Sequence, residues 1–228
     1  MKANNLIVIL QARCSSSRLP GKILKKICGI PIVLLCVKRL SNKGAKVIVA
    51  TSKHKTDDKL EEILIKNKID YFRGSLKNVL SRYQFLARRL NKNDYIIRAT
   101  ADNTFPDGNM VSMLLNHVKK LKTDYYGIDH KIHNLPKGFS LEIFTAKRIL
   151  SLKHNLKKED KEHVTLAIYK NKKKYSKPIP LKKLHIAKNF SNLNVSVDTK
   201  KDFKLVKKIF SRYKDPIKIS YKSLLSFL

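Results

Sequence analysis

Three continuous runs of apolar, largely β-branched residues constrain the fold of this chain more than any other feature. They lie at residues 5–11 (NLIVILQ), 46–52 (KVIVATS) and 94–100 (DYIIRAT). Runs without polar alternation are typical of strands that are buried on both faces, as in parallel sheets. Segments with helical periodicity separate the runs, so the sequence predicts a βαβαβ arrangement and an α/β fold.

Helical patterns fill the intervals between these strands and continue after them. Thr56, Asp57 and Ser75 stand where helix N-caps are expected. The predicted helices cover residues 30–42, 56–68, 75–90, 107–121, 158–171 and 200–213.

Two further strands are predicted, a half-exposed one within 138–145 and a last one at 193–199. The α/β pattern persists to the end without a linker or a repeat. We therefore expect a single domain over residues 1–228 with a Rossmann-like, doubly wound, mostly parallel sheet. The basic, proline-containing segment 170–180 predicts a small inserted arm.

The chain has a large excess of positive charge: 50 Lys and Arg against 17 Asp and Glu, a formal net charge of +33. Such an excess raises nucleic acid as a partner. Only ten of the cations are Arg, however, and the lysines are spread along the whole chain. This scatter favours a solvated surface or a polyanionic small substrate over a nucleic-acid site. A nucleic-acid-binding protein on a degenerate enzyme scaffold remains an alternative.

The cysteines and the N-terminal region predict the compartment. Cys14, Cys28 and Cys36 include no C-x-x-C pair, so neither a disulfide framework nor a zinc site is expected, and a reducing cytoplasm fits. The apolar run at 6–10 is too short for a secretory signal or a membrane span. We therefore expect a cytoplasmic protein with no membrane partner.

A polar, basic loop follows the first predicted strand, at residues 11–22 (QARCSSSRLPGK). In open α/β sheets, ligands bind at the carboxyl ends of the strands. The loop matches neither a Walker loop nor a dinucleotide fingerprint. Its small residues, guanidinium groups and ammonium are nevertheless the groups that bind polyphosphate. A basic surface loop without a ligand is the alternative.

Two aspartates, Asp102 and Asp198, directly follow predicted strands. Carboxylates at such positions are typical ligands of Mg²⁺, which takes one or two of them together with phosphate oxygens. The alternative for Asp198 is a helix cap. Together with the basic loop, the pair favours a Mg²⁺ site over a helix cap, which is what nucleotidyl transfer from a nucleoside triphosphate to a small-molecule acceptor would require.

Seven ordered segments resemble the sugar-activating cytidylyltransferases, the family of CMP-sialic acid and CMP-KDO synthetases and of the spore-coat-polysaccharide proteins. The resemblance implies a nucleotide-diphospho-sugar transferase fold of the A type. It also implies transfer of CMP from CTP to an acidic or phosphorylated sugar, with release of pyrophosphate, for a capsule or another surface polysaccharide. The segments are residues 11–33, 47–52, 71–83, 96–107, 136–144, 161–165 and 197–206.

The resemblance also implies roles for individual residues. Catalysis would depend on Arg13 and Lys22, which bind the triphosphate, and on Asp102 and Asp198, which bind the metal. Further nucleotide contacts would come from Gln11, Ala12, Ser15, Ser16, Ser17, Arg18, Arg73, Gly74, Ser75 and Thr100. The acceptor would be bound by Arg98, Ser140, Glu142, Glu162 and His163, and His163 would serve as a base if the acceptor oxygen is a hydroxyl.

The chain departs from the family pattern in the predicted metal loop, where Pro106 is also displaced along the chain, and in the predicted acceptor site. Ala101 stands where a glycine precedes the metal-binding aspartate, and Ser140 stands where an aspartate is common. The second departure predicts a changed acceptor. A guanylyl-, uridylyl- or adenylyltransferase acting on a sugar phosphate is the alternative, since the same loop would serve any base. By analogy we expect a homodimer, with residues 125–145 and 170–180 as interface candidates.

Overall fold

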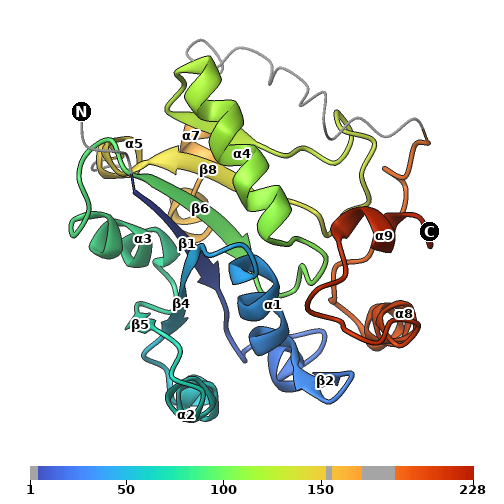
Figure 1. Ribbon diagram of the computed structural model, residues 1–228. Helices are drawn as coiled ribbons and strands as arrows, with labels where there is room; N and C mark the ends of the chain where they lie inside the picture. The colour runs from blue at the N-terminus through green and yellow to red at the C-terminus, as the bar shows by residue number, and fades with distance from the viewer. Residues whose placement is uncertain (1–4, 153–155, 171–187) are drawn as a thin grey trace.

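The computed structural model describes residues 5–152, 156–170 and 188–228. A six-stranded sheet forms its centre (Figure 1). In their order across the sheet, the strands are β5 (Tyr71–Gly74), β4 (Lys46–Ser52), β1 (Leu6–Gln11), β6 (Tyr95–Thr100), β8 (Glu142–Thr145) and β7 (Tyr125–Gly127). The pairs among β5, β4, β1 and β6 are parallel, whereas β8 pairs antiparallel with β6 and with β7. The predicted mostly parallel α/β sheet is therefore confirmed.

The three β-branched runs form the centre of this sheet, as predicted. The interiors of β1 and β6 are almost completely buried because helices cover both faces. The sequence analysis missed β5 and β7, which are short and carry partly exposed residues. It predicted a half-exposed strand within 138–145, but β8 is shorter and all its residues are buried. Two short strands, β2 (Lys26–Ile27) and β3 (Ile30–Pro31), pair separately.

The predicted strand at 193–199 is wrong. Residues 193–199 run beside loops, and an isolated bridge between Lys137 and Asn194 is the only β-pairing among the described residues there. Val195 donates its N–H to the carbonyl of Lys137, and Val197 donates to the carbonyl of Asp102. Because its backbone groups pair with two different loops, the segment cannot continue the sheet.

Helices cover the two faces of the sheet (Figure 1). Their apolar sides form one cluster with Val8 and Leu10 of β1 and a second with Ile7 and Ile9, which point to the opposite face. The first face packs against α1 (Ile32–Ser41), α2 (Asp58–Lys66), α4 (Gly108–Leu121), α8 (Lys200–Phe210) and α9 (Tyr221–Leu225). The second packs against α3 (Val79–Ala87) and α5 (Ala146–Leu150), with α6 (Lys158–Glu162) and α7 (Leu166–Lys170) nearby.

Two predicted helices differ from the observed ones. The helix expected from residue 75 begins at Val79, because the side chain of Asn78 caps it by accepting from the N–H of Ser81 at 3.1 Å. The helix expected at 158–171 is interrupted after α6, where His163 has a non-helical backbone with φ −98° and ψ 81°. From residue 171 on, the predicted arm lies outside the described residues. None of the helices described is long and apolar enough to cross a membrane.

Arg39 of α1 joins the helix to two distant loops from a fully buried position. Its guanidinium donates to the carbonyls of Thr104 and Phe105 at 2.9 and 2.7 Å, and to those of Pro216 and Ile219 at 2.8 and 2.7 Å. Burial lowers the pKa of Arg39 to about 10, so the side chain remains charged at neutral pH. This one side chain satisfies carbonyls that would otherwise be buried without donors.

Replacing Arg39 should destabilise the fold strongly. We expect Arg39→Met to lower the free energy of unfolding by about 3 kcal/mol, because buried carbonyls lose their charged donor. Urea unfolding monitored by circular dichroism measures this change. Arg88→Met at an exposed arginine is the matched control and should change stability by less than about 0.5 kcal/mol. Equal stability of the two variants would contradict this role of Arg39.

Candidate active site

The basic loop predicted from the sequence leaves the carboxyl end of β1 and closes on itself. The carbonyl of Cys14 accepts from the N–H of Ser16 at 2.8 Å and from the N–H of Gly21 at 2.9 Å. Gly21 adopts a φ of +64°, which glycine reaches without steric cost. The turn delivers the next residue, Lys22, into a short 3₁₀ helix, η1 (Lys22–Leu24).

Several donors of this loop are left unused within the described chain. The backbone N–H groups of Ser15, Ser17 and Arg18 make no hydrogen bond to any described residue. The hydroxyl of Ser15 is buried and likewise has no partner there. Unused N–H groups beside cationic side chains are what an anion-binding loop requires. Binding of a polyphosphate by this loop stays a prediction.

Lys22 brings together the two aspartates that the sequence analysis singled out. Its Nζ lies 3.2 Å from Oδ2 of Asp102 and 2.9 Å from Oδ1 of Asp198. Asp102 follows β6, and the backbone bond from Val197 to Asp102 places Asp198 beside it. Arg18 adds a second cation, with its Nη2 3.0 Å from Oδ1 of Asp198. Although burial opposes ionisation, the hydrogen bond and charge of Lys22 hold the pKa of Asp198 below its usual range.

Asp198 does not cap α8, which was the alternative role considered for it. Thr199 caps α8, since its hydroxyl accepts from the N–H of Asp202 at 3.2 Å. The carboxylate of Asp202 in turn accepts from the N–H of Thr199 at 2.8 Å, which completes a capping box. The carboxylate of Asp198 is therefore available to the cations of the loop.

These two carboxylates fit a divalent cation. One ammonium already touches both of them, so a single cation can contact Asp102 and Asp198 together. In the described part of the chain, no group of three or more His, Cys, Asp or Glu residues is placed to hold a metal ion. A Mg²⁺ ion bound here would take its other oxygen ligands from phosphate and water, which is the usual mode for this ion.

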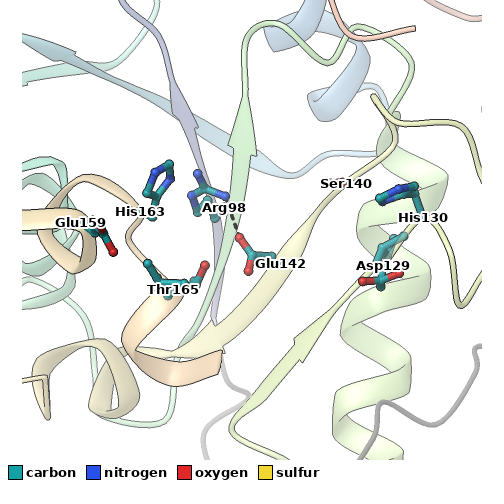
Figure 2. A pocket seen from close by; sticks show the side chains of 10 residues that line it. Arg98, Asp129, His130, Ser140, Glu142, Glu159, His163 and Thr165 are labelled. Carbon is teal, nitrogen blue, oxygen red and sulfur yellow. Dashed lines mark hydrogen bonds and ion pairs between the residues drawn. The ribbon is translucent and has the colours of Figure 1, made fainter. Parts of the chain in front are cut away.

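A cavity of about 640 Å³ lies beside β6 and β8, whose Arg98 and Glu142 are among its lining residues (Figure 2). At its floor, Nη1 of Arg98 lies 2.6 Å from Oε2 of Glu142, whose Oε1 accepts from the hydroxyl of Tyr125 at 2.9 Å. Although burial opposes the charge, Glu142 raises the pKa of the Arg98 guanidinium. Nη2 of Arg98 reaches Oε1 of Gln11 at 3.5 Å, which links the cavity to the end of β1.

The predicted acceptor-binding residues divide into two groups. Arg98, Ser140, Glu142 and His163 all line the cavity. Glu162 does not belong to the lining, and its Oε1 instead lies 3.6 Å from Nη2 of Arg13. The cavity thus gathers four of the expected side chains.

The predicted nucleotide-contacting residues also occupy different surroundings. Gln11 and Thr100 are paired in register at the ends of β1 and β6, and Ala12 is buried next to them. Ser16 accepts from the N–H of Leu19 at 3.4 Å.

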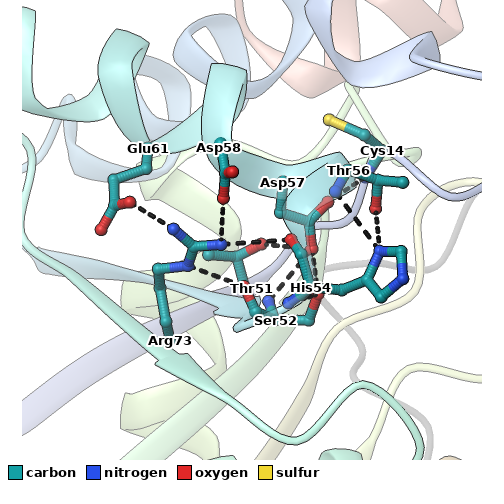
Figure 3. Close-up of polar contacts among 9 residues, drawn as sticks. All are labelled: Cys14, Thr51, Ser52, His54, Thr56, Asp57, Asp58, Glu61 and Arg73. Carbon is teal, nitrogen blue, oxygen red and sulfur yellow. Dashed lines mark hydrogen bonds and ion pairs between the residues drawn. The ribbon is translucent and has the colours of Figure 1, made fainter.

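Arg73 is engaged within the protein (Figure 3). Its guanidinium contacts Glu61 and lies 2.6 Å from Asp58, and it donates to the carbonyl of Ser52 at 2.8 Å. These contacts hold β5 and α2 together. The neighbouring Gly74 packs closely on α3, where a Cβ would lie 2.8 Å from Cγ of Arg82.

Ser75, next in the chain, accepts from the N–H of Asn78 at 3.0 Å, directly before α3. A contact of residues 73–75 with a nucleotide stays a prediction.

Some lining residues were missed by the sequence analysis. Asp129 and His130 follow β7 after the buried Ile128, so they are polar residues at a strand end. These two residues were not predicted because β7 was not recognised as a strand from the sequence. Glu159 lies in α6. Thr165 lies in the break after α6, where the sequence predicted a continuous helix.

Comparisons with known proteins agree with this geometry. Residues 7–225 match the family model described as cytidylyltransferase. An uncharacterised protein of Methanocaldococcus jannaschii is 32% identical over 227 residues, which cover 98% of this chain and 90% of that protein. The spore coat polysaccharide biosynthesis protein SpsF of Bacillus subtilis is 28% identical over 235 residues, covering 99% and 94%.

A solved structure of a cytidylyltransferase from Leptospira borgpetersenii superposes with a TM-score of 0.87 at 25% identity, covering 99% of this chain and 94% of that one. The likeness thus extends over the strands, the basic loop and the segment that carries Asp198. Because the family model spans nearly the whole sequence, this chain belongs to the cytidylyltransferase family.

Proposed function

We propose that this protein is a Mg²⁺-dependent cytidylyltransferase that transfers CMP from CTP to an acidic or phosphorylated sugar-like acceptor, releasing pyrophosphate. The observation that carries the proposal is the Lys22 ammonium held between Asp102 and Asp198, next to a loop with unused N–H groups. Family membership supports the nucleotide, and the name of the Bacillus subtilis relative supports a role in surface polysaccharide biosynthesis.

The loop residues would bind the triphosphate of CTP. The N–H groups of Ser15, Ser17 and Arg18, which have no partner among the described residues, would donate to phosphate oxygens, and Arg13 and Lys22 would add positive charge. Mg²⁺, held by Asp102 and Asp198, would neutralise negative charge on the triphosphate. Binding charge at fixed positions is the main contribution that a protein makes to phosphoryl transfer.

The acceptor would enter the 640 Å³ cavity beside Arg98. Its oxygen attacks the α-phosphorus, a new oxygen–phosphorus bond forms, and the bond to the β-phosphate oxygen breaks with its electron pair leaving on pyrophosphate. A carboxylate or phosphate oxygen is already ionised at neutral pH and needs no base. A hydroxyl acceptor would pass its proton to His163, which also lines the cavity.

Ser140 would distinguish this cavity from those of relatives that carry a carboxylate there. A hydroxyl is neutral, so Ser140 adds no charge next to the ion pair of Arg98 and Glu142. The acceptor would therefore meet hydrogen-bonding groups at this position, which suits a polyhydroxylated sugar.

Nucleotide selectivity tests the reaction type. We expect pyrophosphate release with CTP in Mg²⁺ and little with ATP, GTP or UTP, using a panel of sugar acids and sugar phosphates as acceptors. A coupled pyrophosphate assay on purified protein measures this. Turnover with another nucleotide in preference to CTP would contradict the assignment of the base, and a folded protein inactive with every pair would contradict the reaction.

Removing one carboxylate of the pair tests the metal site. We expect Asp102→Asn to lower kcat by about 100-fold or more, because charge on the triphosphate is no longer neutralised at a fixed position. The Mg²⁺ concentration needed for half-maximal rate should also rise.

Asp70→Asn is the matched control, since Asp70 forms an exposed ion pair with Lys46 at 3.1 Å. It should keep normal turnover, and circular dichroism should show that both variants fold. Near-normal turnover of Asp102→Asn would remove Asp102 from the metal site.

A further inference from the structure

A second buried carboxylate contacts the basic loop from outside the metal pair. Asp57 lies at the end of the 3₁₀ turn η2 (Lys55–Asp57) and is completely buried. Its Oδ1 accepts from the backbone N–H of Cys14 at 2.7 Å, 43 residues away in sequence. Figure 3 shows the carboxylate between that loop residue and the end of β4.

The other oxygen of Asp57 binds the end of β4. Oδ2 accepts from the hydroxyl of Thr51 at 3.0 Å and from the N–H of Ser52 at 3.1 Å, and it also contacts the hydroxyl of Ser52. From its sequence context Asp57 was expected to cap α2, but its side chain makes no cap hydrogen bond. It points instead into the space between β4 and the loop.

Cys14 connects Asp57 to the rest of the loop. Its carbonyl accepts from Ser16 and from Gly21, so the peptide group that follows Cys14 closes the turn. The N–H of the same residue is held by Asp57. The unused N–H groups of Ser15, Ser17 and Arg18 therefore belong to a turn that Asp57 holds through Cys14.

A carboxylate suits this position better than an amide. Each oxygen of Asp57 accepts from a backbone N–H, Oδ1 from that of Cys14 and Oδ2 from that of Ser52. An asparagine would direct its NH₂ at one of these two N–H groups and leave that group unpaired. Although burial opposes ionisation, hydrogen bonds from Cys14 and Ser52 hold the pKa of Asp57 below its usual value.

We propose that Asp57 is a positioning residue for CTP binding: it fixes Cys14 so that the free N–H groups of the loop converge on the triphosphate. Asp57 acts through the loop and does not touch the nucleotide. The inference rests on the proposed function, because it takes CTP as the ligand of the loop. A loop held in one conformation avoids the entropic cost of ordering when the nucleotide binds.

A purely structural role would give a different result, and a matched residue separates the two. Asp94 is also buried, and it accepts from the N–H groups of Asn5 and Asn91 at 3.0 and 2.9 Å. It lies at the amino end of β6, whereas the loop leaves the carboxyl end of β1. Asp94→Asn should therefore destabilise the fold without changing the loop.

The experiment compares wild type, Asp57→Asn and Asp94→Asn in two measurements. The first is the dissociation constant of CTP with Mg²⁺ and no acceptor, by calorimetry. The second is amide hydrogen exchange of residues 12–21 without nucleotide. We expect Asp57→Asn to weaken CTP binding by about 10- to 100-fold, which is the usual effect of losing a side chain that orients a binding group. The same variant should speed amide exchange in the loop. Asp94→Asn should leave both values at wild type.

A second variant, Thr51→Val, tests the same inference if Asp57→Asn does not fold. It keeps the shape of the side chain and removes one donor to Asp57, so it should weaken CTP binding in the same direction by a smaller factor. Wild-type CTP affinity and loop exchange in the folded Asp57 variant would overturn the inference, as would equal weakening by Asp94→Asn. Wild-type protein that binds no CTP would instead contradict the proposed function, while the exchange of the loop would still show whether Asp57 anchors it.

Discussion

A single buried ammonium, that of Lys22, needs partners that lie 80 and 176 residues further along the chain. A charge withdrawn from water is tolerated only when it is paired, and here Asp102 and Asp198 pair with it. To meet this requirement, the loop after β1, the end of β6 and the segment before α8 must converge at one edge of the sheet. The parallel alignment of β1 with β6 brings the first two together, and the bond from Val197 to Asp102 adds the third.

The large positive charge of the chain does not predict the charge balance of this site, because the cations of the site are already paired with carboxylates. Arg18 and Lys22 contact Asp198, and Arg13 faces Glu162. A triphosphate would compete with these carboxylates for the same guanidinium and ammonium groups. Under the proposed function, a divalent cation at Asp102 and Asp198 would compensate the charge that Lys22 neutralises in the structure. Binding of the nucleotide would then strengthen binding of the metal, and binding of the metal would strengthen binding of the nucleotide. This coupling does not require every group of one ligand to touch the other ligand.

The sequence predicted those features that depend on local pattern. Uninterrupted β-branched runs predicted β1, β4 and β6, and Asp102 was singled out because it follows β6. Asp198 was singled out as the end of a strand that the structure does not contain, yet its carboxylate does lie beside Lys22 and Asp102. Features that depend on tertiary contacts were missed or misjudged. The 193–199 segment has a strand-like composition, yet its hydrogen bonds go to loops. Asp57 has the sequence context of a helix cap, and only the folded chain shows that its carboxylate faces Cys14.

The location of Asp198 also has a consequence for synthesis of the protein. Translation delivers β1, the basic loop and β6 well before the segment that contains Asp198, and that segment is held in place by bonds to loops made earlier. A growing chain on the ribosome can therefore form its parallel strands while Lys22 still lacks one carboxylate partner. A chain that ends before this segment would leave the Lys22 ammonium with Asp102 as its one carboxylate partner at this edge of the sheet. Under the proposed function, the metal site would then be complete only after the C-terminal segment has folded back beside the first loop.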